Sequence, residues 1–318
     1  MKVLALSSTK RQPDFSTVFE HLGKAVDLDL KMLDKDAQQH LRRFLSAIDC
    51  ARYDRILVDL RFKYIHRQTR LLSTLPGLLV YEEDACQNYI ESSQWRGAFS
   101  RFYRKLPNAR VVVTGFSVAE RLAREGFAVH FIPKGYDPET VFFENGERDI
   151  EAGFIGRIGS AVYKERRSLL ERLAVEESLQ ILRTETGAPY RKMLNRIRCF
   201  ISADIGLTEY MAKNFEAMAC GCVLLAYRQG SEEAAIGLED GVHLLLYSDM
   251  AELRGHLAEL RGDPALAQRI AEEGRKFVER SLSHPQLAAR LAKVLEMPWP
   301  TPEPLSRWQT FLDRINPF

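Results

Sequence analysis

Three consecutive acids, Glu82, Glu83 and Asp84, follow the apolar run Gly77–Tyr81. Neighbouring carboxylates repel one another unless a ligand, a cation or a proton compensates their charge, so such a run is a candidate functional site. The apolar run predicts a strand, and ligands of open α/β sheets bind beyond the carboxyl ends of strands. We therefore take Glu83 and Asp84 as catalytic candidates. A loop that simply faces water is the alternative interpretation.

A second stretch with chemical potential runs from Asn214 to Val223. Asn214 is typical of a helix N-cap, and Gly221 is typical of the left-handed residue that ends a helix. The apolar run Cys222–Tyr227 then predicts a buried parallel strand. Glu216 falls in the first turn of this helix, where a carboxylate complements the helix dipole. A ligand-binding role for Glu216 is the alternative.

Cations for an anionic ligand gather between residues 156 and 167. The segment Gly156–Gly159 follows the predicted strand Ala152–Ile155 but lacks the three-glycine spacing of a dinucleotide-binding loop. A diphosphate needs cations or amides to hold its charge, and Arg157 follows the end of a strand. Lys164, Arg166 and Arg167 are candidates for a second cation, or else belong to a solvated helix terminus.

The chain offers little sign of a metal or a prosthetic group. Cys220 and Cys222 are one residue apart but lack a second pair of ligands, so buried small residues explain them better. No Asp-x-Asp motif ends a predicted strand. We therefore expect no metal and no cofactor. Five cysteines in all, an odd and sparse number, fit a reducing compartment such as the cytoplasm.

The elements that must position these residues alternate along the chain. Short apolar runs with strand character alternate with segments of helical periodicity, among them a predicted helix over Gln38–Ile48, which is typical of doubly wound parallel sheets. A length of 318 residues indicates two domains. No run of eighteen apolar residues predicts a membrane span, and Met1–Ser8 is a first strand, too short for a signal peptide.

The predicted domain boundaries follow changes in composition. Residues 1–140 form the first domain, a polar, turn-rich linker follows, and residues 150–295 form the second domain. Residues 296–318 form a tail that begins with an extended proline-rich segment and ends with a predicted helix over Ser306–Ile315.

The stretch Glu216–Val223, Glu-Ala-Met-Ala-Cys-Gly-Cys-Val, resembles the nucleotide-binding signature of group 1 glycosyltransferases. The resemblance implies the GT-B fold, in which two Rossmann-like, doubly wound parallel-sheet domains enclose a cleft. It implies that Glu216 binds the ribose of a nucleotide-sugar donor, with Asn214 and Phe215 beside it. The family places another Glu eight residues earlier, where this chain has Thr208, a predicted donor contact. Glu209 follows one residue late and is a further catalytic candidate.

Other segments also resemble that family. Gly156-Arg157 is similar to its Gly-Arg segment, where an arginine and a later lysine neutralise the diphosphate, which implies this role for Arg157 and for Lys164 or Arg166. Pro133–Asp137 is similar to the turn that closes the first domain. The resemblance further implies that the tail 296–318 crosses back onto the first domain. The glycine pair that usually follows the first strand is missing; Ser8, Thr9 and Lys10 could bind a phosphate in its place.

Charge is unevenly distributed between the halves. Residues 1–137 carry 22 Lys and Arg against 16 Asp and Glu, a net charge of +6, while the remainder carries −4. Basic residues lie among aromatic ones at Lys63-Tyr64 and at Arg101–Arg104. A basic first domain suits a peripheral contact with an anionic membrane or an acidic acceptor, and a solvated surface without a partner is the alternative.

Two function classes follow. The first is a retaining, metal-independent glycosyltransferase that uses a nucleotide-diphosphate sugar as co-substrate. Its acceptor would be a glycan or a lipid-linked molecule, in the synthesis of cell-surface polysaccharide, lipopolysaccharide or another glycoconjugate, in the cytoplasm or at the inner face of the membrane. The second is a non-catalytic protein of the same fold that binds a nucleotide sugar or pairs with an active partner. Nucleic acid is not an expected partner.

Overall fold

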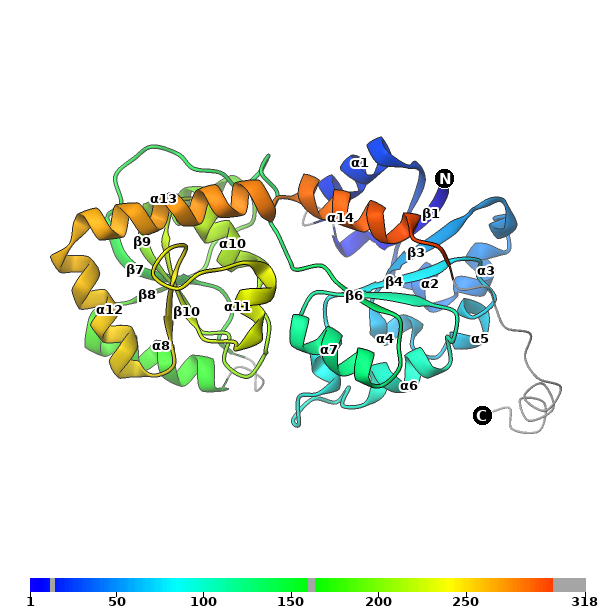
Figure 1. Cartoon of the computed structure of the whole chain (residues 1–318), viewed down its shortest axis with the longest axis horizontal. Coiled ribbons are helices and arrows are strands. Elements are labelled where there is room, and N and C mark those ends of the chain that lie inside the picture. The colour runs from blue at the N-terminus through cyan, green and yellow to red at the C-terminus, as the bar shows by residue number, and fades with distance from the viewer. Residues whose placement is uncertain (12–14, 160–163, 300–318) are drawn as a thin grey trace.

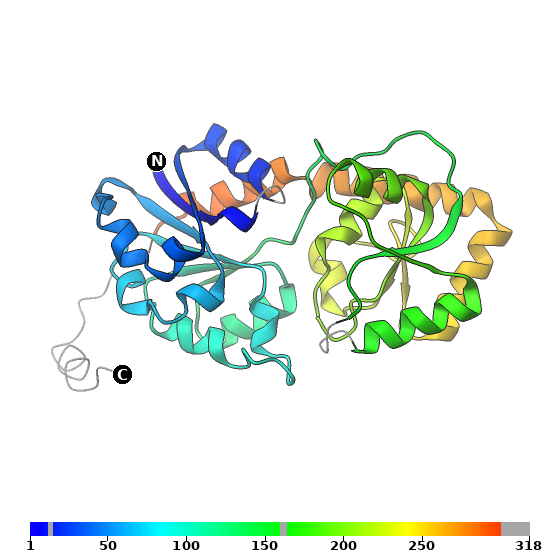
Figure 2. The ribbon, with the colours of Figure 1, turned by 180° about the vertical axis from the view of Figure 1, so that it is seen from behind.

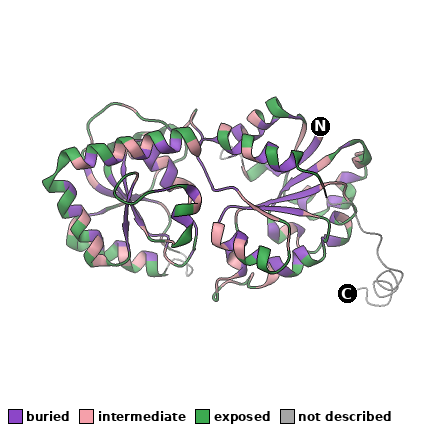
Figure 3. Cartoon of the chain, in the orientation of Figure 1, coloured by how far each residue is buried: buried purple, intermediate pink, exposed green. Residues whose placement is uncertain are grey.

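Two parallel β-sheets form the centres of two domains that lie side by side (Figure 1). The structure is a computed structural model, and it describes residues 1–11, 15–159 and 164–299. The strands are buried in both domains, whereas the outward faces of the helices are exposed (Figure 3). This is the predicted α/β class, and the near-continuous apolar strands are those of sheets covered on both faces.

The sheet of the first domain has the strand order β2-β1-β3-β4-β5-β6, with all neighbours parallel. At its centre, Ala5 of β1 pairs with Leu30 of β2 on one side and with Leu57 of β3 on the other. The strands are β1 Lys2–Ser8, β2 Asp27–Leu33, β3 Arg55–Asp59, β4 Leu78–Glu82, β5 Arg110–Val113 and β6 Val129–Phe131.

Helices cover both faces of this sheet. Leu4 and Leu6 of β1 pack with the layer that contains α2 to α7, whereas Val3 and Ala5 pack with α1 and α14. The alternation follows from the pleat, which points successive side chains to opposite faces. The helices are α1 Ser16–Ala25, α2 Lys35–Gln39, α3 Leu41–Leu45, α4 Phe62–Ile65, α5 Thr69–Leu72, α6 Ala98–Arg104, α7 Phe116–Arg124 and the short 3₁₀ turns η1 Thr9–Arg11, η2 Cys50–Arg52 and η3 Ala85–Asn88.

The second domain repeats the plan with the order β11-β10-β9-β7-β8. Helices α9, α10, α11 and α13 pack on one face, and α8 and α12 pack on the other. The strands are β7 Ile150–Ile155, β8 Gln180–Leu182, β9 Ile197–Ser202, β10 Val223–Tyr227 and β11 Leu245–Tyr247. The helices of this domain are α8 Lys164–Glu177, α9 Ala188–Arg196, α10 Ala212–Ala219, α11 Ser231–Ile236, α12 Met250–Gly262 and α13 Pro264–Ser281; α14 His284–Glu296 follows and packs on the first domain.

The chain passes between the domains twice, and the two crossings are bonded to each other. Tyr136 pairs with Ser283 in a parallel bridge, with the amide of Tyr136 donating to the carbonyl of Leu282 and the amide of His284 donating to the carbonyl of Tyr136. Both views show the two crossings side by side (Figures 1 and 2). A Cβ at Gly135 would come within 2.1 Å of the carbonyl oxygen of Leu282, so only glycine permits this approach.

The return to the first domain comes earlier than predicted. We expected the second domain to run to residue 295 and the tail 296–318 to cross back. Instead α14 already packs on α1, where Thr17 and the ring of His284 lie 2.5 Å apart, and Arg55 and Arg110 donate to the last carbonyls of α14. The predicted helix over Ser306–Ile315 lies outside the described residues.

Two local predictions also differ from the structure. The predicted helix over Gln38–Ile48 is broken at His40, where α2 ends and α3 begins, and the side chain of Gln38 is used to bond Ser8 and the carbonyl of Leu33. Asn214 is not an N-cap, because α10 begins at Ala212 and Asn214 lies inside it. No described helix is both long enough and apolar enough to cross a bilayer.

The close approach at Gly135 makes a first prediction. Gly135→Ala must push the two crossings apart, and overpacking of this kind costs roughly 1–3 kcal/mol. We expect a lower midpoint of thermal unfolding. The matched control is Gly146→Ala, where an added Cβ meets nothing within 4 Å. Equal midpoints for the two variants would contradict the close contact.

Candidate functional site

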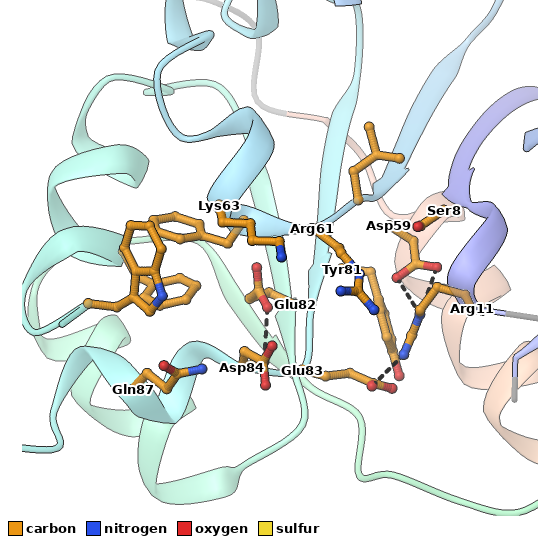
Figure 4. A pocket seen from close by; sticks show the side chains of 14 residues that line it. Ser8, Arg11, Asp59, Arg61, Lys63, Tyr81, Glu82, Glu83, Asp84 and Gln87 are labelled. Carbon is orange, nitrogen blue, oxygen red and sulfur yellow. Dashed lines mark hydrogen bonds and ion pairs between the residues drawn. The ribbon is translucent and has the colours of Figure 1, made fainter. Parts of the chain in front are cut away.

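A cavity of about 340 Å³ opens at the carboxyl ends of β1, β3 and β4 in the first domain (Figure 4). Its aromatic wall is formed by Phe62, Trp95 and Phe99. Its polar wall carries the acids and cations that follow these strands: Arg11, Asp59, Arg61, Lys63, Glu82, Glu83 and Asp84. A cavity with one aromatic and one polar wall suits a polar ligand that has an apolar face.

Arg11 organises the polar wall of this cavity. Its Nε lies 3.1 Å from the carboxylate of Asp59, and its Nη1 lies 2.5 Å from Oε2 of Glu83. Asp59 also accepts a hydrogen bond from Ser7 at 2.7 Å. Three segments distant in sequence, which follow β1, β3 and β4, are thereby held together (Figure 4).

The three consecutive acids have different environments. Glu82 is 7% exposed, and burial holds the pKa of its carboxyl well above the usual value, which favours its neutral form. Burial alone would also raise the pKa of Glu83, but the charge and hydrogen bond of Arg11 outweigh burial and lower it. Asp84 is exposed. The structure thus leaves Glu83 as an ionised carboxylate on the cavity wall and Asp84 at its rim.

A buried ion pair joins this wall to the second domain. Nζ of Lys134 lies 2.9 Å from Oε1 of Glu209, and their side chains are 9% and 2% exposed. Lys134 also donates to Thr114 at 2.9 Å and to the backbone carbonyl of Glu83 at 3.3 Å. Burial would lower the pKa of Lys134, but the charges of Glu209 and Glu83 raise it above its usual value. The ammonium is therefore charged.

A second carboxylate also crosses between the domains. Glu232 of α11 accepts hydrogen bonds from the backbone amides of Phe116, at 2.8 Å, and Ser117, which open α7. A carboxylate at a helix N-terminus satisfies amides that have no partner within the helix. Burial raises the pKa of Glu232 to about 7 in spite of these bonds.

The predicted catalytic residue Glu209 lies in this interdomain contact. Its carboxylate bonds Lys134 through Oε1 and accepts from Thr114 through Oε2 at 3.2 Å, so both oxygens have partners inside the interface. Glu209 thus links the two domains, and its catalytic role stays a prediction. The preceding residue, Thr208, is exposed and has a φ of 55°, a strained left-handed conformation for a β-branched residue.

Several predicted donor contacts lie inside the second domain. Arg166 pairs with Asp204, and Asn214 donates to the same carboxylate at 2.8 Å. Asp204 and Asn214 are fully buried, and Phe215 packs in the core against Tyr210. Arg166 and Asn214 thus connect α8 and α10 to the end of β9 through Asp204.

Other predicted donor residues remain accessible. Arg157 and Lys164 are exposed on the loop after β7 and at the start of α8. Glu216 is partly exposed and accepts a hydrogen bond of 2.6 Å from the hydroxyl of Tyr190 on α9. It does not lie in the first turn of α10, so the helix dipole does not explain it. Its role in binding a ribose stays a prediction.

Sequence reasoning missed Arg11, Asp59, Lys134 and Glu232. Arg11 and Asp59 follow strands, so the rule about strand ends could have found them. No local signal joins Lys134 to Glu209, because 75 residues separate them. Among the described residues, no group of three or more His, Cys, Asp or Glu side chains is arranged so that it could hold a metal ion.

Comparison with known proteins assigns the second domain to a family. Residues 161–296, which contain α10 and Glu216, match the model of a family described as glycosyl transferase-like. This match confirms, for the second domain, the resemblance drawn from the Glu216–Val223 stretch. The chain as a whole has the GT-B fold. No curated protein has a sequence detectably similar to that of this chain.

Solved structures share its fold over nearly the whole chain. Sucrose-phosphate synthase from Thermosynechococcus elongatus has a TM-score of 0.67 at 14% identity, covering 92% of this chain and 98% of that chain. HepE from Anabaena, in complex with UDP and glucose, has a TM-score of 0.67 at 13% identity, covering 94% and 100%. The phage T4 enzyme BGT, in complex with its UDP-glucose substrate, has a TM-score of 0.57 at 10% identity, covering 93% and 100%.

The interdomain ion pair makes a second prediction. Lys134→Met leaves the Glu209 carboxylate buried without a counter-charge, and breaking a buried pair in this way costs about 3–5 kcal/mol. We expect a large fall in the urea concentration at the midpoint of unfolding. Lys134→Met/Glu209→Leu should recover much of the loss.

The control for this prediction is an exposed pair. Arg196 and Asp149 lie 2.5 Å apart with both side chains nearly half exposed. Arg196→Met should therefore change stability far less than Lys134→Met does. Similar losses of stability for Lys134→Met and Arg196→Met would show that the buried interdomain pair contributes no more to stability than the exposed pair.

Proposed function

We propose that this glycosyltransferase moves a sugar from a UDP-sugar to an acceptor bound in the first-domain cavity. The carrying observation is that Lys134 bonds both the carbonyl of Glu83 and the carboxylate of Glu209. The ionised acid of the first domain and the loop that leads into α10 therefore meet at one place. UDP is proposed because solved structures of the same fold contain UDP or UDP-glucose.

The donor would lie along the second domain. In this proposal Glu216 accepts hydrogen bonds from the ribose hydroxyls, with Tyr190 beside it, and exposed cations such as Arg157 and Lys164 approach the diphosphate. Negative charge grows on the diphosphate as the bond between the sugar and its oxygen breaks, so cations there stabilise the transition state more than the ground state. Because side-chain cations supply this charge, we propose a metal-independent reaction.

The acceptor would lie against Glu83. The aromatic wall of Phe62, Trp95 and Phe99 suits the apolar face of a sugar ring, and the polar wall suits its hydroxyl groups. In a reaction with retention, the departing diphosphate oxygen takes the proton of the acceptor hydroxyl, which attacks the same face of the donor sugar. The Glu83 carboxylate would stabilise the positive charge that develops on the anomeric carbon and orient the acceptor.

Substitutions at Glu83 and Glu216 test this proposal. With UDP-glucose as donor, Glu83→Gln should keep UDP affinity but lower turnover by about 10² to 10³-fold, because it removes a charge that faces the transition state. Glu216→Gln should weaken UDP binding by about 1.5–3 kcal/mol, the range for a hydrogen bond to a charged group. Calorimetry with UDP and slow hydrolysis of UDP-glucose without acceptor measure the two effects.

The outcomes separate the alternatives. Glu91→Gln, on a side chain that is 89% exposed, is the control and should change neither quantity. Binding of UDP without hydrolysis or transfer would favour the non-catalytic alternative. The anomeric configuration of the product, measured by NMR, tests retention, and activity in excess chelator tests metal independence.

We further propose that the acceptor belongs to cell-surface polysaccharide or another glycoconjugate, and that the first domain contacts an anionic membrane at its cytoplasmic face. Lys63, Arg67, Arg101, Arg104 and Lys105 are exposed on the helices that cover one face of the first sheet. The interleaved aromatic residues Phe102 and Tyr103 point into the core, so this contact would be electrostatic.

Vesicle binding tests the membrane contact. Each basic residue near an anionic surface contributes about 1 kcal/mol, so Arg101→Ala/Lys105→Ala should weaken binding to anionic vesicles about 30-fold. Binding should also fall at high salt. Arg269→Ala/Arg280→Ala, at two exposed positions of α13, is the control. Retention that ignores both lipid charge and salt would refute the electrostatic contact.

A further inference from the structure

Lys213 is a cation of the second domain that the sequence analysis did not consider. It is the second residue of α10, and its Nζ lies 4.3 Å from the centre of the Phe154 ring on β7. A Cβ on Gly156 would lie 3.5 Å from the same Nζ. The ammonium is therefore held between the start of α10 and the carboxyl end of β7, directly beside the loop that carries Arg157.

The charged groups that face Lys213 are already committed to other partners. Asp204 is bound by Arg166 and Asn214, and Glu216 accepts from the hydroxyl of Tyr190. Within the described part of the chain, no carboxylate lies within ion-pair distance of the Lys213 ammonium and no acceptor bonds it. Three N–H donors are thus left for a ligand, apart from the contact with the Phe154 ring.

The surroundings of Lys213 disfavour its charge. Burial is the largest influence on the pKa of the ammonium; together with the charge of Arg166 it outweighs the opposing charges of Asp204 and Glu216 and lowers the pKa to about 8. A partly buried ammonium without a counter-charge costs free energy, and a site of this kind gains that energy back when an anion binds. By contrast, Arg157 and Lys164 are exposed, so water competes fully for their charges.

The position of Lys213 on α10 matches a nucleotide. Lys213 and Glu216 are three residues apart, so their side chains leave the same face of the helix about one turn from each other. In a nucleotide the ribose and the phosphates are neighbours. The carboxylate of Glu216 and the ammonium of Lys213 are neighbours in the same way, so one could bind the ribose while the other binds a phosphate.

We propose that Lys213 binds the diphosphate of the nucleotide-sugar donor, an inference that rests on the proposed function. As the bond between the anomeric carbon and the diphosphate oxygen breaks, that oxygen keeps the electron pair, and the Lys213 ammonium compensates the added negative charge. The ammonium keeps its own proton throughout. Arg157 and Lys164 are then secondary contacts at the solvent edge.

The test measures binding of UDP and of uridine at pH 7 by calorimetry. Lys213→Met should weaken UDP binding at least tenfold and leave uridine binding unchanged, because uridine has no phosphate. Lys213→Arg should restore most of the UDP affinity. Without ligand, Lys213→Met should unfold at the same temperature as the wild type or higher, since an uncompensated buried charge is removed. A merely structural lysine would show the opposite.

The pH dependence gives a second readout. An ammonium with a pKa of about 8 is mostly charged at pH 7 and mostly neutral at pH 9. Wild-type affinity for UDP should therefore fall about tenfold between these values, and Lys213→Arg should abolish this fall.

Two controls complete the experiment. Lys192→Met, at an exposed lysine of α9, should leave UDP binding unchanged, and Lys164→Met should weaken it less than Lys213→Met does. Unchanged UDP affinity in Lys213→Met, with a wild type that binds UDP, would overturn the role of Lys213 and leave the proposed function intact. A wild type that binds neither UDP nor UDP-glucose would overturn the proposed function and, with it, this inference.

Discussion

The ion pair between Lys134 and Glu209 is the interaction on which the relative position of the two domains depends. Two charges removed from water cost several kcal/mol each unless their geometry is good and further hydrogen bonds complete it. Here Thr114 and the carbonyl of Glu83 complete the pair. Any movement that separated the domains would break this pair and leave both charges partly buried without a partner. The pair therefore favours one relative position of the two domains.

The two sheets bring their carboxyl ends to this same position. In each domain the polar residues follow the strands because parallel strands end at one edge of the sheet. The first domain contributes an acid kept ionised by Arg11, whereas burial of its neighbour Glu82 favours the neutral form. Opposite pKa shifts in adjacent residues show that environment, more than residue type, assigns the chemical role.

Much of the fold could be predicted from the chain. Alternating apolar runs reflect strands buried on both faces, and the stretch at Glu216 identified the donor half because its helix and strand are local in sequence. The points at which helices end were harder to predict. The side chain of Gln38 bonds Ser8 of β1 and the carbonyl of Leu33 of β2, and α2 ends beside it, whereas periodicity alone predicts that the helix continues.

The candidate site was predictable only where it is local. Glu83, Asp84 and Glu216 could be selected from their neighbours in sequence. The part played by Glu209 could not, because it depends on Lys134, which lies 75 residues away. Likewise, the sequence alone presents Arg166 and Asn214 as polar groups available to a ligand. In the structure both bond Asp204, which follows β9.

The bridge between Tyr136 and Ser283 determines what motion is available to the two halves. Two separate connecting strands would let the domains twist, slide and tilt independently. Because these crossings are hydrogen-bonded to each other and meet without a side chain at Gly135, they form a single narrow band. Rotation about one axis through that band is the motion that leaves its hydrogen bonds intact, and the Lys134–Glu209 pair opposes that rotation. A ligand bound between the domains would thus favour one angle between them. Translation of one domain along the other would require breaking the band.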